Sequence, residues 1–515
     1  MSDHARFVAP ARLIALLTAG SRVLGLLREC AYSYFFGVDP VFSSFRVAFM
    51  IPNLSRRLFG EGAMSSAFIP VFTEVLHHEG RRRARQLAGT VFAALGTVLV
   101  VLTLAAEMGV AIGHLAHPAV TLELTMVMLP YMILICLTAF AGGMLNALNR
   151  FAAPAAAPML LNVVLIAAVY GGSRLAGLAG LRLLYVVSLS VVVAGLAQLG
   201  LQLVALRRAD CPPLLNFRWA DPGLKRIVVL MGPMVLGLSA SQLNVLADSL
   251  IALAFVPEGR GPAVLGYAHM LYQLPLGVFG IALATAIFPL LSSKAAQRDQ
   301  TGLARVFERG MRTSVFIALP ASVGLIVVAA PLVSLLFERG RFSAAASGHV
   351  TRTLVFYALG LVAYSAQHIV VRAFFAVQDT RTPVRVSVSV LALNIALNLA
   401  LVFPLAEGGL ALATAVSAAV QVTWLSVALG RHLPDLRWRF IAAGAARTAV
   451  ATGAMGVVVW CLIRPGALGE ASHLVQLAAG IPAGAAAFVL AARLLRCPEL
   501  TELLSKADRG ARGEG

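Results

Sequence analysis

Long apolar runs alternate with short polar segments along the whole chain. Each run holds about 20 residues, which is the length that an α-helix needs to cross the hydrocarbon core of a bilayer. The pattern predicts an all-α integral membrane protein with about 14 transmembrane helices. The predicted spans are 10–36, 41–59, 87–111, 121–146, 155–172, 182–206, 227–255, 262–291, 312–337, 350–376, 383–404, 407–430, 441–463 and 473–495.

The first predicted span differs from a signal peptide. A signal peptide has a short apolar core followed by a cleavage site of small residues. This run instead carries Arg22, Arg28 and Glu29 within its length. We therefore expect a retained helix whose charged residues lie at membrane depth.

Lysine and arginine residues are distributed unevenly between alternate loops. The loops after the second, sixth, eighth and twelfth spans are rich in them, and that side of the membrane holds about 21 basic residues against about 6 on the other side. The positive-inside rule assigns the richer side to the cytoplasm. Because the number of spans is even, both termini are expected in the cytoplasm.

The sequence resembles itself at two places, in the same order, which indicates an internal duplication rather than chance recurrence of small residues and prolines. Residues 63–70 (AMSSAFIP) recur as 282–289 (ALATAIFP), and 147–154 (ALNRFAAP) recur as 376–383 (AVQDTRTP). The offsets of 219 and 229 residues are close to six helices plus their loops, so the halves are expected to be parallel repeats. We predict an N-terminal lobe over 1–220, a C-terminal lobe over 221–435, and two further helices with a cytoplasmic tail over 436–515.

The composition excludes a soluble globular protein. Hydrophobic residues make up 59% of the chain and charged residues 12%, whereas about a quarter of a soluble domain is charged. The net charge of +18 would suggest nucleic-acid binding in a soluble protein. Here the basic residues lie between membrane spans, so no nucleic-acid partner is expected. The five cysteines are scattered without a CxxC spacing, which argues against a disulfide framework or a zinc site.

The sequence contains no motif of a common catalytic class. The patterns GxxxxGK[ST], HExxH and GxSxG are absent, so we expect neither ATP hydrolysis nor another enzymatic activity within this chain. Two repeated lobes of helices are typical of transporters. A channel would need a filter or a pore ring, and none is recognisable. The sequence therefore favours a transporter without a catalytic site.

Several charged residues lie within the predicted spans, where they are costly and mark functional sites. Guanidinium groups bind phosphate oxygens in bidentate pairs, so arginines that face one cavity indicate an anionic substrate such as a diphosphate. The alternative is that they extend to the interface or form ion pairs, as Arg22 or Arg28 could with Glu29 and Arg57 with Glu61 at i, i+4. The candidate substrate-binding residues are Arg22, Arg28, Arg46, Arg56, Arg57 and Glu61.

Three stretches closely resemble the MurJ (MviN) lipid II flippases, within the multidrug/oligosaccharidyl-lipid/polysaccharide exporter superfamily. The first is SRVLGLLRE at 21–29, and the second is IPNLSRRLFGEGA at 51–63, followed by AFIP. The third is LPLGVFGIALATAIFP at 274–289, and the QDTRTP loop at 378–383 adds to it. The first two strings together are highly specific, and the match extends over the first twelve predicted helices.

The resemblance implies a function and a site. It implies a fold of 14 helices with two lobes in a V around a cationic cavity, and transport of lipid-linked peptidoglycan precursor (lipid II) from the cytoplasmic to the outer leaflet. The family's cavity arginines correspond to Arg22, Arg28 and Arg56, and the last two helices are expected to hold the polyprenyl tail. The location would be the bacterial plasma (inner) membrane, with membrane lipids and cell-wall synthesis proteins as further partners.

Two positions depart from the family pattern. The family usually has an acidic residue in the second helix where this chain has Ser43, and an arginine in the eighth helix where this chain has Met270. One cationic ligand is therefore missing. Arg46, one helical turn from Ser43, is a candidate to replace part of that positive charge.

Some members of the family resemble sodium-coupled transporters, which implies Na⁺ as a coupling ion here. The corresponding polar residues are Asp248, Asn394, Asn398 and Thr414. Oxygen ligands suit a hard cation. The alternative is that Asn394 and Asn398, at i, i+4, form interhelical hydrogen bonds without an ion.

Three other functions remain open at this stage. An exporter of another polyprenyl-diphosphate-linked glycan would use the same fold, and Ser43 and Met270 favour it. A cation-coupled drug antiporter would need acidic residues in its cavity, whereas arginines predominate in the first two helices. A scaffold of the cell-wall machinery would not depend on its intramembrane arginines.

Overall fold

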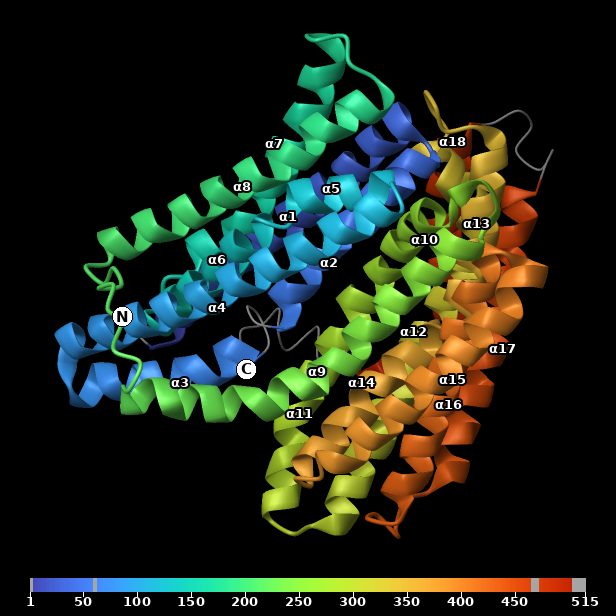
Figure 1. Ribbon diagram of the computed structural model, residues 1–515. Coiled ribbons are helices and arrows are strands. Elements are labelled where there is room, and N and C mark those ends of the chain that lie inside the picture. Colours follow the sequence, from blue (N-terminus) through green and yellow to red (C-terminus); the bar gives the residue numbers. More distant parts are fainter. Residues whose placement is uncertain (1–2, 59–62, 465–471, 503–515) are drawn as a thin grey trace. The chain divides into compact units, whose positions relative to one another are not determined.

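The computed structural model describes residues 3–58, 63–464 and 472–502, and within these ranges the chain is helical with no strand. The prediction of an all-α fold is confirmed (Figure 1). The helices of the first half are α1 (Asp3–Phe36), α2 (Pro40–Ser55), α3 (Ala63–His78), α4 (Gly80–Ala116), α5 (Val120–Met128), α6 (Tyr131–Ala147), α7 (Ala152–Arg174), α8 (Gly180–Arg208) and α9 (Pro222–Phe255). Those of the second half are α10 (Gly261–Pro275), α11 (Ile281–Ala296), α12 (Gln300–Phe337), α13 (Ala344–Leu359), α14 (Leu361–Ala376), α15 (Arg381–Leu405), α16 (Glu407–Gly430), α17 (Trp438–Ile463) and α18 (His473–Leu494).

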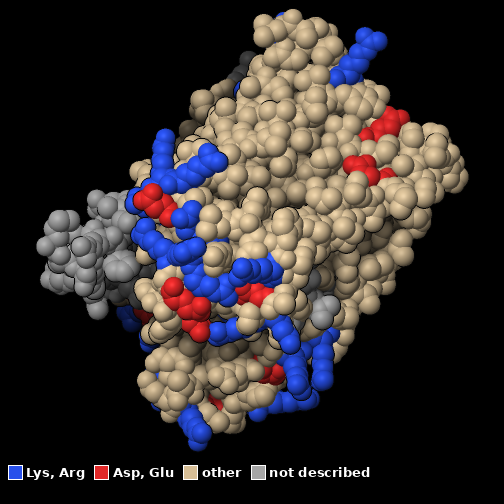
Figure 2. All heavy atoms as spheres, turned by 60° about the vertical axis from the view of Figure 1, so that its left-hand side comes forward, with Lys and Arg blue, Asp and Glu red and all other residues tan. Residues whose placement is uncertain are grey.

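Most of the predicted spans coincide with helices that can cross a membrane. In the described part of the chain, nine helices are long and apolar enough to do so, or up to 11 if each of two bent pairs counts as one span. The three remaining predicted spans correspond to α1, α2 and α9. α1 carries six charged residues, and α2 has only 16 residues. In the described part of α9 the apolar stretch is the shorter Gln242–Phe255. Figure 2 shows Lys and Arg gathered in a band on one face, beside a mostly uncharged surface.

The chain forms two compact units, Met1–Leu253 with Arg339–Phe342, and Ala254–Glu338 with Ser343–Gly515. The same helix pairs pack within each unit. For example, α7 packs on α8 as α15 packs on α16, and α3 packs on α4 as α11 packs on α12. Both units contain a pair of helices bent by 40°, α5–α6 and α13–α14. Asn149 and Gln378, at equivalent positions of the two repeats, both have left-handed backbones with φ of 56° and 61°. These equivalences are what an internal duplication would produce.

The prediction of a loop between the second and third spans is wrong. Residues 63–78 form α3, and a π-helical turn at 56–58 ends α2. The equivalent place in the second unit has a π turn at Leu276–Gly280. It lies inside Gly261–Ala296, which can cross a membrane as one span, as predicted for 262–291. Pro275 directly precedes this turn and lacks the N–H of a regular helix bond. Gly280 is required there, because a Cβ atom would lie 2.9 Å from Ser365 Oγ of α14.

The two helices outside the duplication, α17 and α18, pack on each other and on α12. Their apolar contacts include Phe316 of α12, Met455 of α17 and Phe488 of α18. A buried ion pair adds to these contacts, since Arg312 of α12 donates from Nε to Glu499 Oε1 over 2.6 Å. Gly444 of α17 allows this pair, because a Cβ atom there would lie 2.6 Å from Arg312 Nε.

Candidate functional site

A buried carboxylate joins two of the predicted arginines in the first unit. Glu29 of α1 is only 5% exposed. Arg28 Nη2 donates to Glu29 Oε1 over 2.7 Å, and Arg46 Nη2 of α2 donates to Glu29 Oε2. The fold therefore brings Arg28 and Arg46 to one acceptor, although they lie on different helices. Two guanidinium groups share one carboxylate, so with Glu29 ionised this group carries one net positive charge.

Asn162 of α7 completes the group from a third helix. Its Oδ1 accepts a hydrogen bond from Arg28 Nη1 over 3.0 Å, and its Nδ2 donates to the Ser21 carbonyl oxygen over 3.2 Å. Asn162 thus orients Arg28 and ties α7 to α1. We call Arg28, Glu29, Arg46 and Asn162 the arginine cluster. Sequence reasoning missed Asn162, although a lone amide in the apolar span 155–172 was a signal that could have identified it.

Aromatic rings surround the arginine cluster. The Arg28 guanidinium lies 5.6 Å from the centroid of the Tyr32 ring, and that of Arg46 lies 4.9 Å from the Phe42 ring. Tyr32 and Phe42 contact each other edge to face, with centroids 5.3 Å apart. Ring faces attract cations and hold guanidinium groups in place in apolar surroundings. The cluster is therefore preorganised before any ligand is present.

The other predicted arginines of the first unit lie outside this cluster. Arg22 of α1 is exposed. Arg56 donates from Nε to Asn53 Oδ1 over 2.8 Å, within the π turn that follows α2. Arg57 is exposed and donates to Gln242 Oε1 of α9 over 3.3 Å. The predicted partner of Arg57, Glu61, lies outside the described residues.

The two residues that depart from the family pattern lie in different surroundings. Ser43 of α2 is fully buried, one turn before Arg46. Met270 of α10 is half-buried and follows His269, whose ring lies 5.1 Å from that of Tyr272. Tyr272 stacks in turn on Tyr357 of α13 at 4.7 Å. This part of the second unit is therefore aromatic where the family pattern has a charged side chain.

The candidate ion ligands are divided between the units. Asn394 and Asn398 of α15 are buried, and Asn398 Nδ2 donates to Asn394 Oδ1 over 2.9 Å. Asn394 Nδ2 donates to Ser417 Oγ of α16 over 3.3 Å, so this pair does form an interhelical hydrogen bond. The Thr414 hydroxyl donates to the Leu410 carbonyl oxygen within α16. Asp248 is buried in α9 of the first unit.

A search among known proteins gives a consistent picture. The family model described as lipid II flippase MurJ matches residues 32–472. A relative from Rhizobium meliloti, a probable lipid II flippase MurJ, is 36% identical over 81% of this chain and 81% of its own length. The lipid II flippase MurJ of Burkholderia cenocepacia is 33% identical over 87% of this chain and 90% of its own.

Solved structures share the fold. A lipid II flippase MurJ in an inward closed conformation superposes with a TM-score of 0.77 at 22% identity, over 94% of this chain and 99% of that one. An inward-facing multidrug resistance MATE family transporter of the MOP superfamily superposes with a TM-score of 0.58 at 18% identity, over 81% of this chain and 94% of that one. The family model and the curated relatives extend over most of the chain, and they show that it belongs to the MurJ family of lipid II flippases.

Proposed function

We propose that this chain moves lipid II from the cytoplasmic to the outer leaflet of the inner membrane and so supplies cell-wall synthesis. The observation that carries the proposal is the arginine cluster. Arg28 and Arg46 share the single carboxylate of Glu29 between helices at membrane depth, which leaves a positive charge for an anionic ligand to neutralise. The names of the curated relatives support the same substrate.

Electrostatics explains why such a cluster suits a lipid-linked diphosphate. Transfer of a bare diphosphate through hydrocarbon would cost on the order of tens of kcal/mol. Guanidinium groups lower that cost, because they bind phosphate oxygens through charge-assisted hydrogen bonds. In this proposal Arg28 and Arg46 bind the diphosphate, and Asn162 holds Arg28 in position. Arg22, Arg56 and Arg57 line its route, and the polyprenyl tail stays in lipid or beside α17 and α18.

The proposed transport cycle is alternating access. The site opens first to the cytoplasm and then to the outer surface as the two repeats move against each other. The substrate must bind the two states with different affinity to shift their populations. Glu29 is the proposed competitor, since the diphosphate and Glu29 seek the same two guanidinium groups. The cycle includes no covalent step on the substrate, and both termini would lie in the cytoplasm.

A leaflet-resolved assay in vesicles tests the proposal directly. Vesicles that contain only this protein and labelled lipid II should show protein-dependent appearance of the label in the opposite leaflet. Arg28→Ala should abolish it while leaving the amount of membrane-inserted protein unchanged. Arg174→Ala is the matched control, because it removes an exposed arginine at the last turn of α7. Full transport by Arg28→Ala, or loss in both variants, would contradict the proposal.

A second substrate class is favoured by one observation. Met270 and Ser43 stand where the family has charged residues, so the head-group contacts of this chain differ from the family pattern. A related polyprenyl-diphosphate-linked glycan would keep the diphosphate contacts and change the contacts to the sugar. Competition between labelled lipid II and unlabelled undecaprenyl-diphosphate glycans in the same vesicles separates the two, because the true substrate competes best.

We also propose Na⁺ as the coupling ion, on the chemistry of the side-chain oxygens of Asp248, Asn394, Asn398 and Thr414. A sodium gradient should then accelerate transport, and replacing Na⁺ by K⁺ should remove the acceleration. Asn398→Ala should make the rate insensitive to sodium without abolishing binding of lipid II. A rate that is independent of sodium in the unaltered protein would refute the coupling alone.

A further inference from the structure

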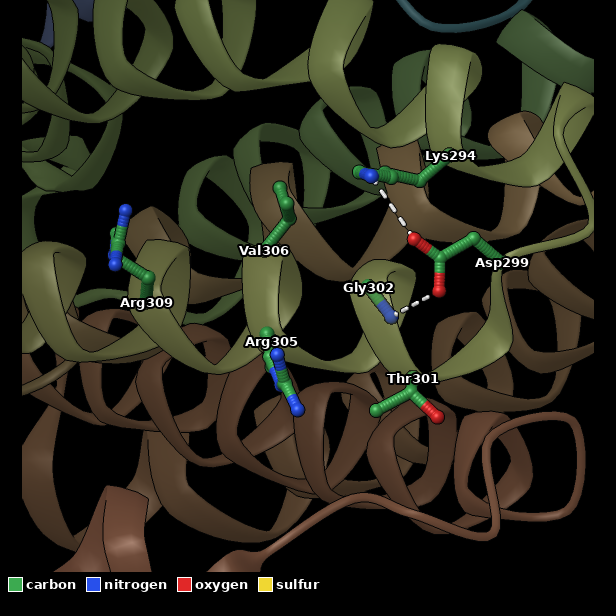
Figure 3. Close-up of a pocket in the computed structure, with 7 residues that line it drawn as sticks. All are labelled: Lys294, Asp299, Thr301, Gly302, Arg305, Val306 and Arg309. Atoms are coloured by element: carbon green, nitrogen blue, oxygen red, sulfur yellow. Dashed lines mark hydrogen bonds and ion pairs between the residues drawn. The ribbon is translucent and has the colours of Figure 1, made fainter.

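A basic pocket in the second unit lies outside the proposed transport machinery. It occupies about 380 Å³ where α11 ends and α12 begins. Figure 3 shows Lys294 of α11 beside Asp299 of the connecting turn, and Arg305 and Arg309 on successive turns of α12. Its lining residues are Lys294, Asp299, Thr301, Gly302, Arg305, Val306 and Arg309.

Internal contacts occupy only part of the positive charge of the pocket. Lys294 Nζ lies 2.9 Å from Asp299 Oδ2, and Asp299 Oδ1 accepts the Gly302 N–H over 2.7 Å. Asp299 therefore neutralises Lys294 and caps α12, so the helix terminus itself is already occupied. Arg309 Nε lies 3.5 Å from Glu502 Oε1, and both side chains are largely exposed. Such an exposed pair contributes little binding energy.

Arg305 and Arg309 lie one turn apart on the same face of α12. Like charges at i, i+4 destabilise a helix, so an anion bound between them would be stabilising. Guanidinium groups are a common recognition element for phosphate, and both arginines line this pocket. A volume of about 380 Å³ also lies within the size range of small-ligand pockets.

The position of the pocket along the chain indicates which anions can reach it. The turn between α11 and α12 belongs to the loops rich in basic residues, which the positive-inside rule assigns to the cytoplasmic face. The phosphates of anionic lipids lie at that level of the membrane, and each basic residue near such a surface attracts them. Soluble phosphate compounds reach the same place from the cytoplasm.

We propose that this pocket binds a phosphate-bearing anion through Arg305 and Arg309, beside the neutral Lys294–Asp299 pair. The phosphate comes either from the head group of an anionic phospholipid of the cytoplasmic leaflet or from a soluble phosphate compound. The site is separate from the arginine cluster, which lies in the other unit. A bound anion would fix the end of α12 on which α17 and α18 pack.

The test measures retention of lipid by the full-length protein. Protein in phosphatidylcholine nanodiscs with a small fraction of phosphatidylglycerol is analysed for bound lipid by native mass spectrometry, and a parallel arm adds inorganic phosphate to lipid-free detergent samples. The informative variant is Arg305→Gln with Arg309→Gln, because both side chains are exposed and the Lys294–Asp299 cap remains intact. The matched control is Arg431→Gln with Arg439→Gln, which removes two exposed arginines of the same unit.

We expect the pocket variant to bind phosphatidylglycerol or inorganic phosphate at least about tenfold more weakly than the unaltered protein, since each lost charge-assisted contact is worth about one such factor. The control should bind normally. Loss in the lipid arm identifies a lipid head group, and loss in the phosphate arm identifies a soluble compound. Equal binding by the pocket variant, or equal loss in the control, would overturn the proposal. Lipid II transport is scored separately, so failure of the flippase proposal leaves this result unaffected.

Discussion

Asn162 is the residue whose role is clearest in the arginine cluster. It accepts from Arg28 and donates to the backbone of α1 at Ser21, so it fixes both the side chain and the helix that carries it. The sequence predicted Arg28 and Arg46 as candidates because charged residues stand out in apolar spans. It also offered an ion pair between Arg28 and Glu29 as the alternative, and the structure contains that pair. It could not predict that Arg46 shares the same carboxylate, or that Asn162 orients Arg28. Those contacts depend on how α1, α2 and α7 pack.

The first prediction concerns Asn162→Ala. The change removes two hydrogen bonds, one of them to a charged group, and should lower the free energy of unfolding by about 1–3 kcal/mol. It should also slow lipid II transport, because Arg28 would lose its orientation while keeping its charge. Thermal unfolding in detergent and the vesicle assay measure the two effects. Unchanged transport at reduced stability would restrict Asn162 to a structural role.

A second prediction concerns the charge balance at Glu29. Removing one partner of a buried ion pair leaves an uncompensated charge and costs about 3–5 kcal/mol. Glu29→Gln should therefore reduce the amount of folded protein sharply. Adding Arg46→Gln restores the net charge and should recover part of the loss. A double-mutant cycle on unfolding measures the coupling, and additive effects of the two changes would contradict the shared contact.

At the level of helices, the hydrophobic runs predicted the positions of the membrane spans better than the irregular turns within them. The apolar pattern continues through residues 262–291, so the periodicity gave no indication of the π turn at Leu276–Gly280. Pro275 was a local signal, but membrane helices often tolerate proline. α3 was missed for the opposite reason, since its polar ends and its position after the charged RRLFGEG stretch resemble a loop.

A third prediction tests the packing at this π turn. Gly280→Ala would bring a Cβ atom to 2.9 Å from Ser365 Oγ and 3.0 Å from the Leu276 side chain. Overpacking of this kind costs about 1–3 kcal/mol, so the thermal midpoint should fall. Gly96→Ala in α4 is the control, because a Cβ atom there meets nothing within 4 Å. Alanine is the better helix former, so the control should be neutral or stabilising. Equal midpoints for both variants would contradict the close contact.

For the whole molecule, the sequence predicted an internal duplication. Two short strings that recur at similar spacings implied it, and the equivalent bends of α5–α6 and α13–α14 agree with it. The segment between α8 and α9, which connects the repeats, was not predictable in the same way. This segment runs back along α4, where Leu214 N donates to the Arg85 carbonyl oxygen and Arg85 Nε donates to the Pro212 carbonyl oxygen. These contacts join residues about 130 positions apart, and no periodic pattern records them.

A fourth prediction concerns this connection and its pH dependence. Burial alone would raise the pKa of Asp221, but hydrogen bonds from Arg83, at 2.7 and 3.1 Å, and from the Gly223 N–H lower it below the usual range. An aspartate with a lowered folded pKa stabilises the protein above its unfolded pKa of about 3.9, and the contribution is lost as the pH falls through the folded value. The thermal midpoint should therefore fall on acidification by more in the unaltered protein than in Asp221→Asn. Identical pH profiles would contradict the contribution of this ion pair.

The buried pair of Arg312 and Glu499 has a consequence for how this protein changes over evolutionary time. Either residue alone is expensive to lose, because the survivor would be left charged in an apolar interior. Gly444 is confined as well, since any larger side chain would collide with the guanidinium. Drift at these positions therefore requires coordinated replacement. Lineages should retain all three residues together or exchange them for an uncharged set in a single concerted step.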